Sequence, residues 1–194
     1  MEQGLARAET MCGYHGTSRD RLAIIAKEGF RVSENDYDWL GTGIYFFQDA
    51  PHRAREWATA RHGQSGVVLG AEIEPADCMN LLDTEWFSFL NDAYNGFLEH
   101  CKRSGRLLPV QRGGAHRLDR AVIDYACGAL QQAGRTIRSV RAAFSEGAPV
   151  FPKSALFSLA HVQIAVRDPS AIRRVWIVHN ESRSPSTLPK QIDF

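Results

Sequence analysis

Two glycines stand directly before an apolar and aromatic run in Leu40-Gly41-Thr42-Gly43-Ile44-Tyr45-Phe46-Phe47. A short apolar run next to turn residues is typical of a buried strand, so we predict a strand over 44–47. The glycines form neither a Walker A loop, since no Gly-Lys-Ser/Thr follows, nor the Gly-x-Gly-x-x-Gly of a dinucleotide-binding fold. Two interpretations remain open: a packed core strand after a glycine turn, or a strand end that holds Tyr45 against a flat ring.

A second motif, Tyr14-His15-Gly16-Thr17, lies upstream at the end of a predicted strand over 11–15. Glycine has no side chain, so a ligand can approach the backbone of Gly16 closely enough for N–H and C=O to pair with a planar amide. His15 can form a hydrogen bond with a sugar hydroxyl. The alternative is that His15 is a structural residue whose hydrogen bonds are satisfied inside the protein.

The rest of the chain is organised as strands, then helices, then strands. Helical spacing and capping residues predict helices over 19–28, 51–62, 84–102 and 118–132. Apolar runs predict further strands over 67–74, 137–144, 159–166 and 172–178. This order favours an α+β protein with a helical insertion over about 83–133.

Composition restricts the class of protein. The length of 194 residues predicts a single domain over 1–194, and 44% hydrophobic with 23% charged residues excludes a disordered chain. The four cysteines form no CxxC pair, so we expect neither a metal site nor a disulfide framework. No apolar segment approaches the roughly 20 residues of a membrane helix, so we expect a cytoplasmic protein with no membrane partner.

Together the two motifs are more specific than either alone. The order His-Gly-Thr, a helix, Gly29-Phe30, a loop, Leu-Gly-Thr-Gly-Ile-Tyr-Phe and a helix with a late aromatic resembles the catalytic domain of the poly(ADP-ribose) polymerase family. The resemblance covers residues 12–75 closely and 136–178 more loosely, and the segment between them has no counterpart. It implies an ADP-ribosyltransferase-like split β-sheet with NAD as co-substrate.

The resemblance also implies roles for single residues. An NAD site would be formed by His15, Gly16, Thr17, Tyr45 and Trp57. His15 would bond the adenosine ribose, and the Gly16 backbone would hold the nicotinamide carboxamide. Tyr45 would stack on one face of the nicotinamide ring, and Trp57 would be the second stacking aromatic.

The chain departs from the family pattern at two positions. Ala54 aligns with a serine that helps to hold the carboxamide, and Gln163, in the late strand, aligns with the catalytic acid. A glutamine accepts a hydrogen bond from a ribose hydroxyl but carries no charge, a deficit of about 1–2 kcal/mol, or roughly ten- to thirtyfold in rate. In the family this acid also activates the growing polymer, so its absence points to transfer of a single ADP-ribose unit.

Two other carboxylate positions need an interpretation. Glu146, in the loop before the late strand, either serves as a base for the acceptor or ends a turn beside Gly147. The Glu72-Ile73-Glu74 pattern resembles the catalytic Glu-x-Glu of another ADP-ribosyltransferase branch. The arginine and Ser-Thr-Ser strands of that branch are missing, so we interpret this pair as structural.

The resemblance implies an NAD-dependent mono-ADP-ribosyltransferase that uses His15, Tyr45, Gln163 and Glu146 on a macromolecular acceptor, protein or nucleic acid. A short transferase of this kind resembles a bacterial toxin or phage-defence effector. The insertion aromatics would then dock a target or an antitoxin, or else pack on the sheet: Trp86, Phe87, Phe89, Tyr94 and Phe97. Two rival functions are an NAD glycohydrolase and a non-catalytic module that binds NAD or ADP-ribose.

Overall fold

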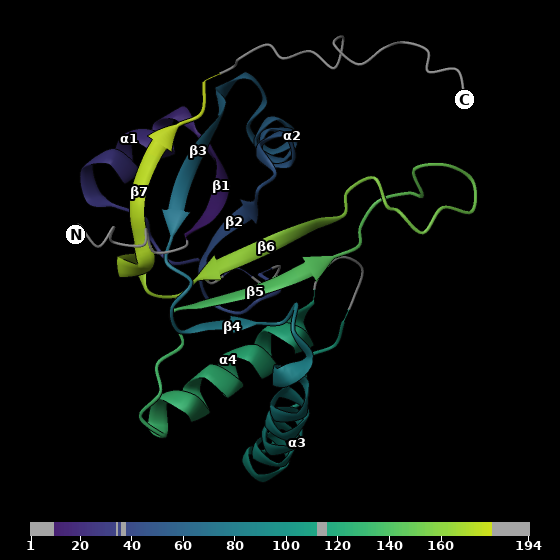
Figure 1. Cartoon of the computed structure of the whole chain (residues 1–194). Helices are drawn as coiled ribbons and strands as arrows, with labels where there is room; N and C mark the ends of the chain where they lie inside the picture. The colour runs from purple at the N-terminus through teal and green to yellow at the C-terminus, as the bar shows by residue number, and fades with distance from the viewer. Residues whose placement is uncertain (1–9, 34, 36–37, 112–115, 180–194) are drawn as a thin grey trace, which may run out of the picture.

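The computed structural model describes residues 10–33, 35, 38–111 and 116–179. Its seven strands form one sheet in the order β4-β5-β6-β2-β1-β3-β7, in which only β4 and β5 run parallel. The strands are β1 Met11–Ser18, β2 Ile44–Gln48, β3 Gly66–Ile73, β4 Cys78–Asn80, β5 Ser139–Phe144, β6 His161–Val166 and β7 Ile172–Ile177. The helices are α1 Arg19–Glu28, α2 Pro51–His62, α3 Phe87–Ser104 and α4 Arg117–Gln132. The predicted α+β class is confirmed (Figure 1).

Local signals account for the first two helices. Ser18 caps α1 by accepting a hydrogen bond from the Arg21 backbone N–H, and Gly29 ends the helix at a φ of 80° that favours glycine. Pro51 stands in the first turn of α2, where its missing N–H has no helical partner to lose. Both helices have the bounds that the sequence predicts.

The helical insertion differs slightly from the prediction. Residues 84–86 form a 3₁₀ turn, so α3 begins at Phe87 rather than at 84. Helices α3 and α4 pack on the sheet through a buried core that includes Met79, Val140 and Ala165. Four insertion aromatics join this core: Trp86, Phe89, Tyr94 and Phe97. Only Phe87 of the five is half exposed, so four of them pack as in the structural interpretation.

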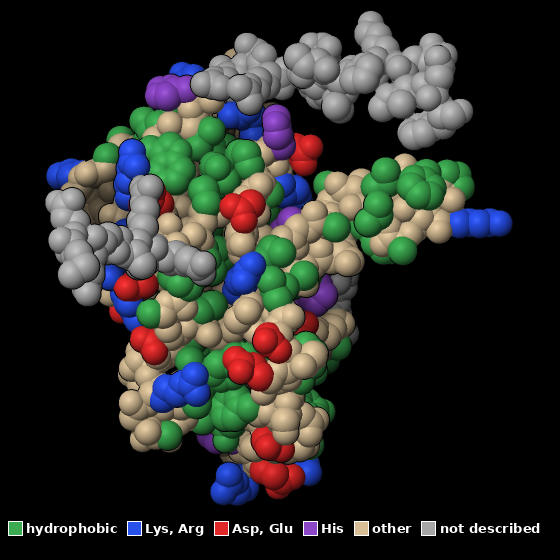
Figure 2. Space-filling view, viewed as in Figure 1, with side chains coloured by type: hydrophobic (Ala, Val, Ile, Leu, Met, Phe, Trp, Pro, Cys, Tyr) green, Lys and Arg blue, Asp and Glu red, His purple; other side chains and the backbone are tan. Residues whose placement is uncertain are grey.

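Several strand bounds also differ from those predicted. The short strand β4 was not predicted, and β6 begins at His161 rather than at 159. The reason for the later start is that residues 159 and 160 belong to a hairpin turn, in which the Leu159 N–H donates to the Glu146 carbonyl. This connection between β5 and β6 projects from the molecule and exposes apolar side chains near its tip: Val150, Phe151 and Leu156 (Figure 2).

The sheet is split between β1 and β2. These strands pair at only two positions, Gly13 with Gln48 and Tyr14 with Phe47, whereas β1 and β3 pair at eight. Beyond Tyr14 the two strands separate, and a side chain bridges the gap: the His15 ring nitrogen Nδ1 lies 2.9 Å from the Tyr45 carbonyl oxygen. The β1–β2 ladder is therefore interrupted in the middle of the sheet.

One face of β2 is shared by two helical layers. Successive side chains of a strand alternate between faces, so Tyr45 and Phe47 lie on the same face. Tyr45 packs against the insertion core, and Phe47 packs beneath α2 with Ala54 and Val68. Strand β2 therefore lies under both α2 and the helical insertion and forms the base of the space between them. Among the described residues, no helix has the length and apolar character to span a membrane.

Candidate functional site

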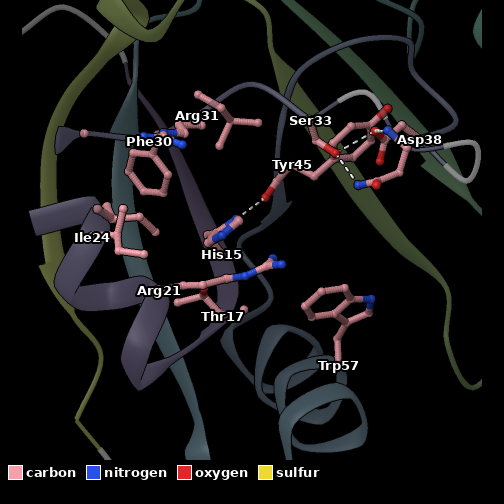
Figure 3. Close-up of a pocket in the computed structure, with 15 residues that line it drawn as sticks. His15, Thr17, Arg21, Ile24, Phe30, Arg31, Ser33, Asp38, Tyr45 and Trp57 are labelled. Atoms are coloured by element: carbon pink, nitrogen blue, oxygen red, sulfur yellow. Dashed lines mark hydrogen bonds between the residues drawn. The ribbon is translucent and has the colours of Figure 1, made fainter.

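A cleft runs through the split in the sheet and consists of two cavities. The outer cavity, of about 380 Å³, lies beside α1, and the inner cavity, of about 320 Å³, lies toward β6. Both are within the usual size range of small-molecule sites. They share five lining residues: His15, Gly16, Asp38, Tyr45 and Trp57. Figure 3 shows the outer cavity with His15 at its centre and Trp57 reaching in from α2.

The residues predicted from the sequence converge on this cleft. Gln163 and Glu146 line the inner cavity together with four of the residues that the resemblance assigns to NAD: His15, Gly16, Tyr45 and Trp57. Thr17 lines only the outer cavity and is 2% exposed, so little of its surface is open to a ligand. The cleft thus unites positions that lie up to 148 residues apart, from His15 to Gln163.

The hydrogen bond of His15 fixes its tautomer. A carbonyl oxygen can only accept, so Nδ1 carries the proton that is donated to Tyr45, and Nε2 is left as an acceptor. The imidazole packs against the rings of Phe30 and Phe46, at centroid distances of 5.4 and 5.6 Å. Burial lowers the pKa of His15, which keeps the ring neutral. A neutral Nε2 can accept a hydrogen bond from a sugar hydroxyl.

Gly16 faces α2 on one side and the split in the sheet on another. A β-carbon built on Gly16 would lie 2.7 Å from the Ala54 carbonyl oxygen and 3.0 Å from the Trp57 ring, so no larger residue fits. The Cys12 carbonyl accepts from the N–H of Asp49, the residue that follows β2, and backbone groups two residues apart point the same way in a strand. The N–H and C=O of Gly16 therefore face the split, beyond the last β1–β2 pair.

Tyr45 is held by the glycine turn that precedes it. Its hydroxyl donates to the Gly41 carbonyl at 2.6 Å and accepts from the Leu40 N–H at 2.9 Å. Burial raises the pKa of Tyr45, so the hydroxyl stays protonated at neutral pH. These bonds hold the Tyr45 side chain in place where it lines both cavities.

The lining residues that were not predicted from the sequence include Arg21, Asp38, Trp39 and Arg53. Asp38 is 4% exposed and accepts hydrogen bonds from the Ser33 hydroxyl at 2.7 Å and the Asn35 N–H at 2.6 Å. Burial is the main cause that raises its pKa. Asp38 thus ties Ser33 and Asn35 to the start of the glycine turn.

The inner cavity ends in a charged pair. A terminal nitrogen of Arg53, Nη2, lies 3.6 Å from the Glu146 carboxylate, and the guanidinium also sits over the Phe47 ring at 5.3 Å. Glu146 is about one-third exposed. The carboxylate therefore lies at the cleft, and both interpretations, acceptor base or turn residue, remain as predictions. Ala54, where the resemblance expects a serine, is fully buried and packs with Phe47 and Val68.

The Glu-x-Glu pair lies away from the cleft. Glu74 pairs with Arg138 at 2.7 Å and Arg173 at 2.6 Å, and Glu72 lies 3.7 Å from Arg174. Neither glutamate lines either cavity. These ion pairs agree with a structural role. Within the described ranges, no three His, Cys, Asp or Glu side chains group as a metal site.

The chain matches no protein-family model and no curated protein. Its function is therefore inferred from the chemistry of the cleft.

Three histidines with lowered pKa values predict how stability depends on pH. Burial lowers the pKa of His15, His62 and His161, whereas these side chains titrate near 6.5 in an unfolded chain. As the pH falls below about 6.5, the unfolded state binds more protons than the folded state, so stability decreases. Asp38 opposes this trend, because its raised pKa lets the folded state bind a proton more readily than the unfolded state as the pH falls. We expect a higher free energy of unfolding at pH 7.5 than at pH 5.5, measured by urea titration.

A pair of variants tests the source of this dependence. His161→Phe should weaken the dependence on pH, whereas His52→Phe, at an exposed position on α2, should leave it unchanged. Equal stability of the unmodified protein at the two pH values would contradict the prediction.

Proposed function

We propose that this chain is an NAD-dependent mono-ADP-ribosyltransferase that transfers ADP-ribose from NAD to a macromolecular acceptor. The observation that carries the proposal is that His15, Tyr45 and Gln163, from three different strands, line one cleft. Two adjoining cavities that share five lining residues suit a dinucleotide, which consists of two nucleoside halves joined by a pyrophosphate. The adenosine half would occupy the outer cavity and the nicotinamide half the inner one.

NAD would be bound by hydrogen bonds and by ring stacking. The His15 Nε2 would accept a hydrogen bond from the adenosine ribose, and the free backbone edge of Gly16 would pair with the nicotinamide carboxamide. The nicotinamide ring would lie between Tyr45 and Trp57, which line both cavities from different elements. Stacking between flat rings adds to the apolar area that binding buries.

The chemistry needs little acid catalysis. The bond between the nicotinamide nitrogen and the ribose carbon breaks, and its electron pair stays on nicotinamide, which leaves as a neutral molecule. The ribose becomes oxocarbenium-like, as in glycoside cleavage. Gln163 would accept a hydrogen bond from a ribose hydroxyl next to this charge. Positioning and electrostatics then supply most of the catalysis.

The acceptor would complete the transfer at the charged end of the inner cavity. A nucleophilic oxygen or nitrogen bonds to the ribose carbon and loses its proton, which the Glu146 carboxylate could take up. A glutamine at position 163 carries no charge to activate a second ADP-ribose, which supports transfer of a single unit.

Arg21 is expected to contribute to NAD affinity. Its side chain lines the outer cavity from α1 (Figure 3) and would lie near the pyrophosphate. Arg21→Ala should raise the Kd for NAD about five- to tenfold, because one partly exposed charged hydrogen bond is lost. The effect should shrink as salt is added. Arg19→Ala removes a charge from the same helix outside both cavities and should leave the Kd unchanged; equal effects of the two variants would contradict the role.

The proposed activity is tested with NAD labelled in its adenylate group. The protein is incubated with this NAD and a whole-cell lysate, and released nicotinamide and labelled macromolecules are measured together. Labelled material that nuclease or protease removes would support a transferase and identify the acceptor class. Free ADP-ribose without a labelled product would indicate a glycohydrolase. Calorimetric binding of NAD without turnover would indicate a binding module, and neither binding nor turnover would overturn the proposal.

A further inference from the structure

A histidine beside Gln163 has no role in the chemistry described so far. His161 is 9% exposed, and strand geometry places its side chain on the same face of β6 as Gln163. Its Nδ1 forms a hydrogen bond with the Leu159 carbonyl oxygen, which can only accept. Nδ1 therefore carries the proton of the neutral ring, and Nε2 presents a lone pair.

This lone pair decides the orientation of the Gln163 amide. The amide nitrogen of Gln163 lies 2.9 Å from His161 Nε2, so its N–H group donates to the imidazole. The carbonyl oxygen of the same amide cannot make this bond, because two acceptors would face each other. The oxygen is therefore turned away from His161, on a side chain that lines the inner cavity.

We infer that His161 is a positioning residue, which holds the Gln163 amide with its oxygen free to accept a hydrogen bond from the NAD ribose. The inference rests on the proposed function, because the NAD ribose is the group that would donate a hydrogen bond to Gln163. It adds that residues 161 and 163 act as a matched pair, in which the acceptor nitrogen of a neutral imidazole meets the N–H donor of an amide.

The surroundings of His161 keep its ring neutral. The rings of Phe47 and Phe144 lie against it, with centroids 5.0 and 5.9 Å away. Burial is the largest cause that lowers the pKa of His161, and the charge of Arg53 lowers it further. The Leu159 carbonyl and the charge of Glu146 act in the opposite sense without reversing the shift.

The pairing has a consequence for the missing acid. Gln163→Glu would restore the acid that the resemblance expects at this position. A carboxylate has only acceptor oxygens, however, and these would face the acceptor nitrogen Nε2 of His161. The contact becomes favourable only if His161 takes up a proton, and the resulting imidazolium would offset the new negative charge. We therefore expect Gln163→Glu at pH 7.5 to be no faster than the unmodified protein.

The first test uses NMR and needs no NAD. ¹⁵N shifts of the histidine rings should show His161 as the neutral tautomer with the proton on Nδ1. In Gln163→Glu, the pKa of His161 should rise by about 1–3 units, as expected for an opposite charge at this range. Gln163→Ala, which adds no charge, should give no such rise. A proton on Nε2, or an unchanged pKa in Gln163→Glu, would overturn the inference even if the protein never cleaves NAD.

The second test separates positioning from packing. His161→Phe keeps an aromatic ring but removes the acceptor, and it should lower kcat about fivefold with little change in KM. His161→Gln offers an amide oxygen near the place of Nε2 and should restore most of the rate. In a Gln163→Ala background, His161→Phe should have no further effect, because no amide remains to be oriented. An equal loss in both backgrounds would mean that His161 acts only through packing.

Discussion

Gly16→Ala is expected to lower the free energy of unfolding by about 1–3 kcal/mol, the usual effect of overpacking. The added methyl group would lie 2.7 Å from the Ala54 carbonyl oxygen and 3.2 Å from the Ala58 β-carbon, so α2 must move away from β1. It would also lie 3.0 Å from the Trp57 ring, which would shift with the helix. Because Trp57 lines both cavities, we further expect NAD affinity to fall about tenfold or more.

A second glycine provides the matched control. Gly128 lies within α4, and apart from the adjacent backbone of that helix a β-carbon there would meet nothing within 4 Å. Gly128→Ala should raise the free energy of unfolding by about 0.5–1 kcal/mol, because alanine is the better helix former. Urea titrations of both variants and calorimetry with NAD test the pair. If the two substitutions had the same effect on stability, the close packing at Gly16 would be wrong.

Tyr45→Ala is expected to reduce kcat/KM for NAD about 100-fold. The variant loses one face of the ring sandwich, and the lost apolar contact and stacking together amount to roughly 2–4 kcal/mol. Tyr45 also packs against the insertion core, so the variant should be less stable, by about 3–5 kcal/mol. Nicotinamide release must therefore be measured at low temperature, where circular dichroism shows the variant to be folded.

Tyr45→Phe distinguishes the ring from the hydroxyl. It keeps the stacking surface but loses the two hydrogen bonds to Leu40 and Gly41. We expect it to lose about 1–2 kcal/mol of stability and to keep most of its turnover. A folded Tyr45→Ala protein with normal turnover would show that nicotinamide does not stack on this residue.

The sequence predicts those parts of the fold that local signals control. The bounds of α1 and α2 follow from a serine cap, glycine stops and a first-turn proline, each of which acts within a few residues. Strand β4 carries no comparable signal, because three residues show no periodicity. It exists through parallel pairing of Cys78 with Ser139, 61 positions away. The sheet order depends on similar long-range pairing, which no local pattern encodes.

In the candidate site, too, local motifs reveal some residues, and only long-range packing brings in the others. His15, Gly16 and Tyr45 stand in short motifs at strand ends, so their residue types and spacing reveal them. Arg21 and Arg53 lie on helices, where a charged side chain ordinarily faces solvent, and only the packing of the helices brings them to the cleft. Trp39 was likewise not predictable from local sequence, because its ring contacts Phe144 and His116, which lie in distant parts of the chain.

The sequence does contain a signal that places His161 beside Gln163. It precedes Gln163 by two residues on a predicted strand, which places both side chains on one face. Its tautomer, however, depends on the Leu159 carbonyl in the preceding turn, and that turn was predicted as part of the strand.

On the proposed function, NAD lies across the split sheet with its nicotinamide in the inner cavity. A crystal structure with a carbocyclic NAD analogue, whose bond to nicotinamide cannot be cleaved in this way, would reveal this placement. We predict the nicotinamide ring between Tyr45 and Trp57, its amide on the Gly16 backbone, and a ribose hydroxyl within hydrogen-bond distance of the Gln163 oxygen. An analogue bound elsewhere, or a cleft left empty at saturating analogue, would contradict the claim.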